Sequence, residues 1–257
     1  MMHDTTCGPA LVDIAAMRDV LAENGIDPAR LQPRIPVDVS TDHSSGVDFF
    51  GRRDAFALNI AREFERNAER YRLMKWASGT LPGLRVHPPG SGIMHTINLE
   101  RLSRVVILEG GLAFPDTLIG TDSHTPMVNG LGVLGWGVGG LEAEGALFGV
   151  PVILRVPEVV GVRFEGRLRE GVMATDLALT VTEALRCFGV TGAFVEFFGS
   201  GVSTLSVGER ACVANMAPEY GASTGYFPID DASCAHLAGL GRPTPEVALV
   251  RDYAKAA

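Results

Sequence analysis

Residues 120–140 read GTDSHTPMVNGLGVLGWGVGG and carry the most informative pattern in this sequence. The polar run Asp122-Ser123-His124 directly follows a short apolar segment, and a packed core has no use for three polar side chains in a row. The glycines that come next lack a Cβ atom and tolerate positive φ, so main-chain N–H groups can approach a ligand closely. The stretch therefore predicts a strand that ends in a loop suited to a carboxylate-bearing substrate.

The composition favours a globular enzyme over a protein that binds nucleic acid or membranes. The 257 residues are 46% hydrophobic and 20% charged, with a formal net charge of −8, which allows one large domain or two smaller ones. This negative net charge disfavours binding to nucleic acids and anionic membranes, because both attract basic surfaces. Charges, Gly and Pro interrupt every apolar run before the roughly 18 residues of a membrane span. Residues 1–17 lack the pattern of a signal peptide, so we expect a cytoplasmic protein.

Apolar residues recur at two periods, and together these predict an α/β fold. Helical spacing occurs in residues 5–17, 54–77, 175–187, 207–217 and 245–256. Short apolar runs typical of strands occur in residues 35–39, 105–108, 117–120, 152–160, 162–169 and 192–198. The runs 152–160 and 162–169 are expected to pair with each other. Because the composition changes after Pro151, we predict two domains, 1–150 and 151–257.

The cysteines give no sign of a metal site. Cys7, Cys187, Cys212 and Cys234 are scattered, and no C-x-x-C pair occurs. In a reducing compartment such residues are most often buried thiols. A cluster or zinc site would form only if the fold gathered all four, and their spacing does not suggest it.

Histidines and aspartates are the main candidates for chemistry. His43, His95 and His124 each end or follow a predicted strand, and Asp42 and Asp122 lie close to two of them. An aspartate beside an imidazole fixes its tautomer and raises its basicity, as in general acid–base catalysis. One such histidine is often structural, but three at strand ends favour an active site. The same residue types suit Zn, Fe or Mn, although their spacing matches no compact metal motif.

Two further residues invite a chemical role. Glu196 lies in the middle of the apolar run GAFVEFFGSG, so we expect a buried carboxylate that needs either a structural ion pair or a functional partner. Ser123 lacks the G-x-S-x-G context of a nucleophile, which disfavours covalent catalysis. His87 and His236 are expected at the surface.

Seven stretches of the chain resemble the aconitase family of iron–sulfur hydro-lyases, in the family's order. They are VDVSTDHSSGVD, EFERNAERYRLMKWA, HPPGSGIMHTINLE, FPDTLIGTDSHTPMVNGLGVLGWGVGGLEAE, GVMATDLALTVTEAL, GAFVEFFGSGV and ANMAPEYGASTGYFPID. The resemblance implies the first two domains of the aconitase fold, with parallel or mixed sheets flanked by helices. It also implies a dehydratase-like lyase or isomerase that acts on a small carboxylate by acid–base elimination and addition.

The family's active-site motifs carry over onto named residues of this sequence. The DHS, PPGSGIxH and TDSHT motifs and the acid of the second-domain strand correspond to Asp42, His43, His95, Asp122, Ser123, His124 and Glu196. Other positions of these motifs and the first residues of the chain are candidates for substrate binding, namely His3, Asp4, Ser44, Ser91, Thr125 and Asn129.

The resemblance also has departures. The family binds a 4Fe–4S cluster through a Cys-Thr-Asn motif and a C-x-x-C motif of a third domain, and neither occurs in this sequence. We therefore do not expect this chain alone to bind the cluster. His3 stands where the family has glutamine, and this added imidazole makes a mononuclear divalent metal ion an alternative cofactor. Its candidate ligands are His3, His43, His95 and His124.

Three interpretations of the function remain open. The chain is either a lyase or isomerase that works without the cluster, or a subunit of a split hydro-lyase whose partner carries it, or a non-catalytic binding module. A homo-oligomer would cover a histidine-lined face in the first case. RNA binding, as in iron-regulatory proteins, is disfavoured by the acidic charge.

Overall fold

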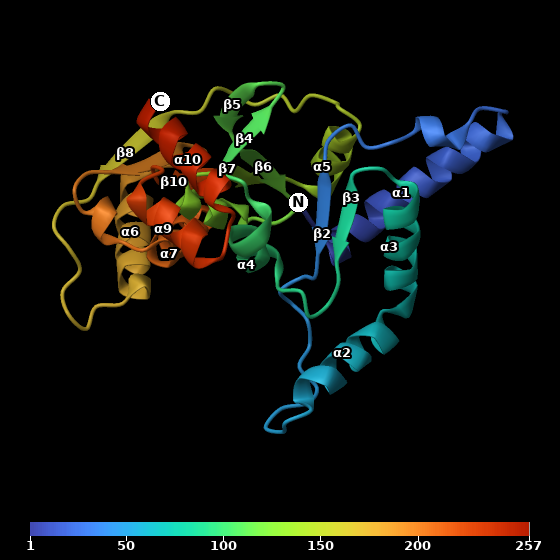
Figure 1. Cartoon of the computed structure of the whole chain (residues 1–257), viewed down its shortest axis with the longest axis horizontal. Coiled ribbons are helices and arrows are strands. Elements are labelled where there is room, and N and C mark those ends of the chain that lie inside the picture. Colours follow the sequence, from blue (N-terminus) through green and yellow to red (C-terminus); the bar gives the residue numbers. More distant parts are fainter. Residues whose placement is uncertain (257) are drawn as a thin grey trace. The chain divides into compact units, whose positions relative to one another are not determined.

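A computed structural model describes residues 1–256 (Figure 1). Its helices and its parallel and antiparallel strand pairs confirm the predicted α/β class. The chain forms two compact units: unit 1 comprises Met1–Ile97 and Val138–Ile153, and unit 2 comprises Asn98–Gly137 and the chain from Leu154 onward. These units differ from the predicted domains 1–150 and 151–257, because the chain passes between them three times rather than once. The predicted domains remain a prediction.

Unit 1 is built on a three-stranded parallel sheet. Its strands are β1 (Met2–His3), β2 (Val37–Ser40) and β3 (Leu84–His87), in that order across the sheet. Its helices are α1 (Asp4–Glu23), a short 3-10 turn at Pro28–Arg30, α2 (Ala55–Arg66), α3 (Ala68–Thr80), α4 (Met94–Ile97) and α5 (Gly140–Leu147). Side chains of α1, β2, α3 and α5 share one apolar core, which holds this sheet in place.

The helix predicted over residues 54–77 is two helices. The chain leaves helical geometry at Asn67, where φ is −114° and ψ is 30°, and asparagine is a weak helix former. The amide of Asn67 and the hydroxyl of Tyr71 both donate to Glu63 Oε1, each at 2.8 Å. None of the residues of α2 is buried, and Phe56 remains 68% exposed. The apolar face of α2 therefore does not contribute to the core of unit 1.

Unit 2 contains three small sheets. The first sheet is the antiparallel pair of β4 (Val106–Glu109) and β5 (Leu112–Pro115). The second is the parallel pair of β6 (Thr117–Gly120) and β7 (Leu134–Gly137). The third is parallel, in the order β10–β9–β8, and contains β8 (Val159–Arg163), β9 (Phe194–Phe198) and β10 (Thr224–Tyr226). The helices are α6 (Ala174–Phe188), α7 (Val207–Asn215), α8 (Ala217–Tyr220), α9 (Asp231–Gly239) and α10 (Thr244–Ala256). A π-helical turn (Asn98–Leu102) and 3-10 turns (Thr125–Leu131 and Val202–Thr204) complete the unit.

The prediction of two paired strands in residues 152–169 is wrong. Only β8 forms there, and it pairs with β9. Pro157 precedes the strand and removes a backbone donor, while Ile153 and Val156 are 94% and 89% exposed. The apolar side chains of residues 152–156 are therefore largely exposed instead of packed in a core.

The site loop of unit 2 packs directly against α7. A Cβ atom at Gly130 would lie 2.5 Å from the backbone nitrogen of Ala211, so only glycine allows this approach of the 3-10 turn Thr125–Leu131 to the helix. The turn is thereby fixed by backbone contact. In the part of the chain that the structure describes, none of the helices combines the length and apolar character that crossing a membrane requires.

Candidate active site

The candidate residues are divided between the two units. Unit 1 holds His3, Asp4, Asp42, His43, Ser44, Ser91 and His95, and unit 2 holds Asp122, Ser123, His124, Thr125, Asn129 and Glu196.

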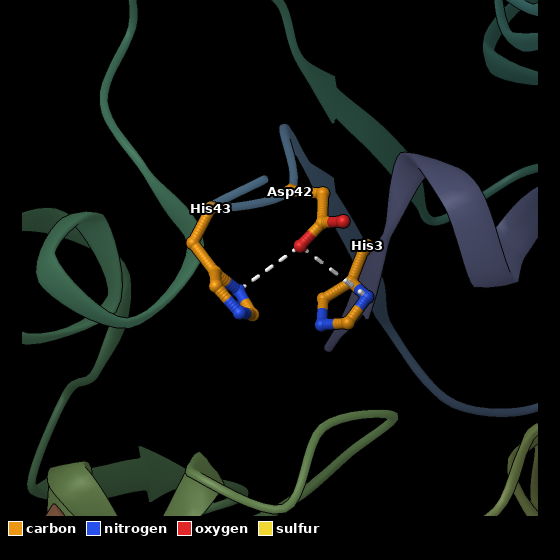
Figure 2. Close-up of side chains that lie close together, drawn as sticks. All are labelled: His3, Asp42 and His43. Atoms are coloured by element: carbon orange, nitrogen blue, oxygen red, sulfur yellow. Dashed lines mark ion pairs between the residues drawn. The ribbon is translucent and has the colours of Figure 1, made fainter. Parts of the chain in front are cut away.

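In unit 1, His3 and Asp42 lie at the carboxyl ends of neighbouring parallel strands. His3 ends β1 and pairs in register with Ser40, the last residue of β2, so the chain reaches Asp42 two residues later. The Asp42 Oδ1 atom lies 3.0 Å from His43 Nδ1 and 4.0 Å from His3 Nδ1. Figure 2 shows both imidazoles flanking the carboxylate, with the two interactions converging on one oxygen. The sequence-predicted Asp42–His43 pair is thus joined by His3.

A buried carboxylate fixes this cluster. Asp4, the first residue of α1, is 2% exposed and accepts a hydrogen bond from the backbone N–H of Asp42 at 2.9 Å. It also accepts one from Arg70 Nη1 at 2.9 Å, and the Tyr71 hydroxyl oxygen, whose proton goes to Glu63, lies 3.4 Å from Asp4 Oδ2. Asp4 therefore ties the loop after β2 to α1 and α3. These contacts give Asp4, predicted to bind substrate, a positioning role.

The two oxygens of Asp42 have different surroundings. Oδ2 accepts a hydrogen bond from the Ser44 hydroxyl, whereas Oδ1 faces the imidazoles of His3 and His43. Burial acts to raise the pKa of Asp42, but the hydrogen bond from Ser44 and the two imidazoles outweigh it and hold the pKa below its ordinary value. Asp42 is therefore an ionised carboxylate at neutral pH.

His95 lies on the short helix α4, and its ring centroid is 6.4 Å from that of His43. It follows a tight turn in which the Ser91 N–H donates to the Pro88 carbonyl at 3.0 Å. Gly92 in this turn has a φ of 136°, which a residue with a Cβ atom rarely adopts. The turn thus brings His95 near His43, on the same unit.

In unit 2, His124 lies between two carboxylates. The Asp122 side chain accepts the His124 backbone N–H at 2.7 Å and lies 3.4 Å from His124 Nδ1. On the other side of the ring, His124 Nε2 is 3.0 Å from Glu219 Oε1. The Ser123 hydroxyl lies 3.4 Å from Nδ1. A histidine held in this way has a fixed ring orientation, which suits proton transfer.

Glu219 is not among the site residues identified from the sequence. It lies on α8, 95 residues away from His124 along the chain. The stretch ANMAPEYGASTGYFPID contains it, and an acid among small and apolar residues is a signal of the same kind as the one seen at Glu196.

Glu196 is not the buried acid that the sequence predicts. Along β9, Val195 and Phe197 are buried, whereas Glu196 is exposed, because successive side chains of a strand point to opposite faces. Glu196 lines a pocket of about 210 Å³ together with Asp116, Thr224 and Tyr226. Its catalytic role remains a prediction.

Thr125 and Asn129 are buried in the turn that follows His124. The Thr125 hydroxyl donates to the Asp122 carbonyl at 2.7 Å and so closes the turn. Asn129 is fully buried, and its main-chain carbonyl accepts a hydrogen bond from the backbone N–H of Phe227 at 3.1 Å. Both residues support the loop, and their predicted contact with substrate remains a prediction.

Comparison with known proteins assigns the family. The profile of the aconitase family (aconitate hydratase) matches residues 1–257. This chain belongs to the aconitase family. Aconitate hydratase A of Thermus thermophilus is 54% identical over 260 residues, that of Streptococcus mutans 53% over 255, and that of Pseudomonas aeruginosa 52% over 259. These alignments cover 99–100% of this chain and 28–29% of each relative, so the chain spans less than a third of their length.

The cysteines of this aconitase-family chain do not fit an iron–sulfur cluster. Cys7 is buried in unit 1, and the other three lie in unit 2, where Cys234 is buried and Cys187 is exposed. Burial raises the pKa of the Cys7 thiol to about 12, so it is protonated at neutral pH, whereas a cluster is held by thiolates. Among the described residues, the groups close enough to share a metal ion contain no cysteine. The cysteines of this chain therefore do not supply the ligands of such a cluster.

Proposed function

We propose that this chain supplies acid–base residues of an aconitase-type hydro-lyase or isomerase that acts on a small carboxylate. The proposal rests on the position of His124, which lies between the carboxylates of Asp122 and Glu219 in the loop after β6. The family assignment supports it, because the similar relatives are aconitate hydratases. The Asp42–His43 pair of unit 1 is a second polar centre of the same kind.

The proposed chemistry is a reversible loss of water. His124 takes a proton from the carbon next to a substrate carboxylate, and the electron pair left on that carbon forms the carbon–carbon double bond. The hydroxyl on the neighbouring carbon leaves as hydroxide and takes up a proton from solvent to become water, and His124 later releases its own proton to solvent. Hydration is the reverse, with protonated His124 returning its proton to carbon. Asp122 and Glu219 stabilise the imidazolium that forms in the first step and prevent the ring from turning away.

A second arrangement of the same function has its own support. The four cysteines do not form a cluster site, and the chain matches only 28–29% of the length of its relatives. We propose, as the alternative, that further polypeptide completes the site, either in one chain or as a partner subunit.

Replacing His124 by glutamine tests the proposal. The matching segment of Thermus thermophilus aconitate hydratase A is exchanged for this chain, and hydration of aconitate is followed by the loss of the ultraviolet absorbance of its conjugated double bond. Because glutamine cannot exchange a proton with carbon, we expect the rate to fall by about 10²-fold or more. The chain alone is assayed in parallel, and hydration by it would make further polypeptide unnecessary.

The matched control is His236→Gln, which changes another partly buried histidine of unit 2, on α9. We expect this variant to keep the rate of the unaltered chimera. A His124→Gln variant with a native circular dichroism spectrum and a near-normal rate would refute the acid–base role.

A further inference from the structure

Unit 1 brings together two imidazoles and one carboxylate. The ligand atoms that His3, Asp42 and His43 can offer all lie within 4.8 Å of one another (Figure 2). We propose that these three side chains bind one divalent transition-metal ion, for which Zn²⁺ has the best-matched coordination chemistry.

The spacing of the three side chains fits such an ion. Zinc–nitrogen and zinc–oxygen bonds are about 2.0–2.2 Å long, so neighbouring ligand atoms of a tetrahedral site are roughly 3.3 Å apart. The distances from Asp42 Oδ1 to the Nδ1 atoms of His43 and His3, 3.0 and 4.0 Å, lie on either side of this value. The Thr5 hydroxyl is 3.4 Å from His3 Nδ1, a long contact that a metal bond would replace.

Hydrogen bonds from neighbouring residues position the proposed ligand Asp42. Ser44 engages the Oδ2 atom of Asp42, and Asp4 accepts the backbone N–H of Asp42. Hydrogen bonds of this kind orient the residues that coordinate a metal, and their loss commonly weakens metal affinity by about 10–100-fold. His3 is fixed by its position in β1, whose register with β2 is set by backbone pairing. The carboxylate and one imidazole are thus positioned before any ion binds.

The donor set indicates the class of metal. Imidazole nitrogens suit Zn²⁺ and its neighbours, whereas Mg²⁺ and Ca²⁺ prefer oxygen ligands alone. Three protein ligands also leave a fourth position of a tetrahedral ion open, as in catalytic zinc sites. The His3 side chain is 7% exposed and closes one side, while that of His43 is 52% exposed and leaves an entry path.

A bound cation would add to the proposed function. Its open position would attract a carboxylate or hydroxyl oxygen of a substrate and stabilise negative charge there. Metal binding itself does not depend on the proposed function, because it is measured without turnover.

A second histidine–aspartate pair of unit 1 provides the matched control. His87 Nε2 lies 2.8 Å from Asp38 Oδ1. Asp38 is also bound by Arg85, through Nε at 2.9 Å and Nη2 at 2.5 Å. The guanidinium already neutralises this carboxylate, and the pair has one imidazole rather than two. We therefore expect no specific metal binding at His87.

The experiment is a zinc titration of the full chain. The protein is prepared without a polyhistidine tag, stripped with a chelator and titrated with Zn²⁺ in competition with a chromogenic chelator. We expect one Zn²⁺ per chain. His3→Gln and His43→Gln should each weaken the affinity by at least about tenfold, since even loss of a supporting hydrogen bond costs that much. His87→Gln should leave it unchanged. Co²⁺ in place of Zn²⁺ should give the intense visible absorption of a tetrahedral site.

Several results would overturn the proposal. The first is that Zn²⁺ binding does not saturate. The second is that His43→Gln binds Zn²⁺ with the same affinity as the unaltered chain. The third is that His87→Gln loses Zn²⁺ binding. Metal accompanied by an equal amount of sulfide would do so as well, because a mononuclear site holds none. The exposed position of His43 makes His43→Gln safe for folding, so this variant decides if His3→Gln unfolds. Zinc binding with normal turnover of His124→Gln would refute only the proposed function.

Discussion

Replacing Arg210 by alanine is expected to lower the free energy of unfolding of unit 2 by about 3–5 kcal/mol. The Arg210 side chain is 0% exposed and binds Asp230 through both nitrogens of its fork, at 2.9 and 2.5 Å. It also donates to the Val202 carbonyl at 3.0 Å. Alanine would leave the Asp230 carboxylate without its counter-ion and an empty space in the interior.

The same change should loosen the start of α9. Asp230 Oδ1 accepts the backbone N–H groups of Ala232 and Ser233, at 3.0 and 3.1 Å, and so caps this helix. Arg210 lies on α7, directly before Ala211, against which the turn after His124 packs. The ion pair thus joins the helix cap to the element that supports the His124 loop.

Urea unfolding followed by tryptophan fluorescence measures this effect. The chain has two tryptophans, so in a Trp76→Phe background Trp136 reports on unit 2 alone. The control is Arg163→Ala, which removes an ion pair with Glu165 whose side chains are 67% and 64% exposed. An exposed pair contributes about 0–1 kcal/mol, so this variant should unfold almost as the unaltered chain does. A loss below about 1 kcal/mol in Arg210→Ala would contradict the assigned role of the buried pair.

Replacing Gly137 by alanine is expected to disturb the Asp122–His124 loop from the backbone. A Cβ atom at Gly137 would lie 2.5 Å from the Asp122 carbonyl oxygen and 3.0 Å from Ser123 Cα. Since both are backbone atoms, no side-chain rotation can relieve the clash, and the loop itself must move. We expect a cost of about 1–3 kcal/mol in stability. A displacement near 1 Å should also lower the hydration rate by about 10²-fold.

Gly140→Ala is the matched control for this variant. No heavy atom lies within 4 Å of the Cβ position at Gly140 apart from its own chain neighbours and helix backbone, and its φ is not positive. Both variants are compared in the chimera assay for aconitate hydration and in urea unfolding. Equal rates for Gly137→Ala and Gly140→Ala would mean that the position of the loop does not limit catalysis.

Elements with a strong local signal were predictable from the sequence. The strand at residues 117–120 has the predicted bounds, and the helices predicted at 175–187 and 245–256 lie within α6 and α10. Periodicity and turn residues determine such segments within a few positions of the chain. The predicted strands at 152–169 did not form as a pair because apolar composition alone does not say what a segment packs against. Ile153 and Val156 are exposed in spite of their side chains.

In the candidate site, too, contacts between sequence neighbours could be predicted and contacts between distant elements could not. Asp42–His43 and Asp122–His124 are neighbours along the chain, and their ion pairs were predictable from sequence. The contact of His124 with Glu219 depends on how α8 is placed against the loop, which no local pattern reports. The apolar neighbours of Glu196 predict a buried position, yet Phe194 and Phe198 share its more exposed face of β9. In a short strand, a one-residue choice decides which face is buried.

The hydrogen bond from Asp42 to Asp4 has a consequence for amide exchange. His43, Ser44 and the next residues of this loop are exposed, and their amides should exchange with deuterium quickly. The amide of Asp42 should not, because its acceptor is the buried carboxylate at the start of α1. Its hydrogen is released only when the loop detaches from α1 or unit 1 opens. The exchange rate of the Asp42 amide, slow beside the fast amides of the loop, would thus report whether the His3–Asp42–His43 cluster is assembled. This measurement needs no ligand.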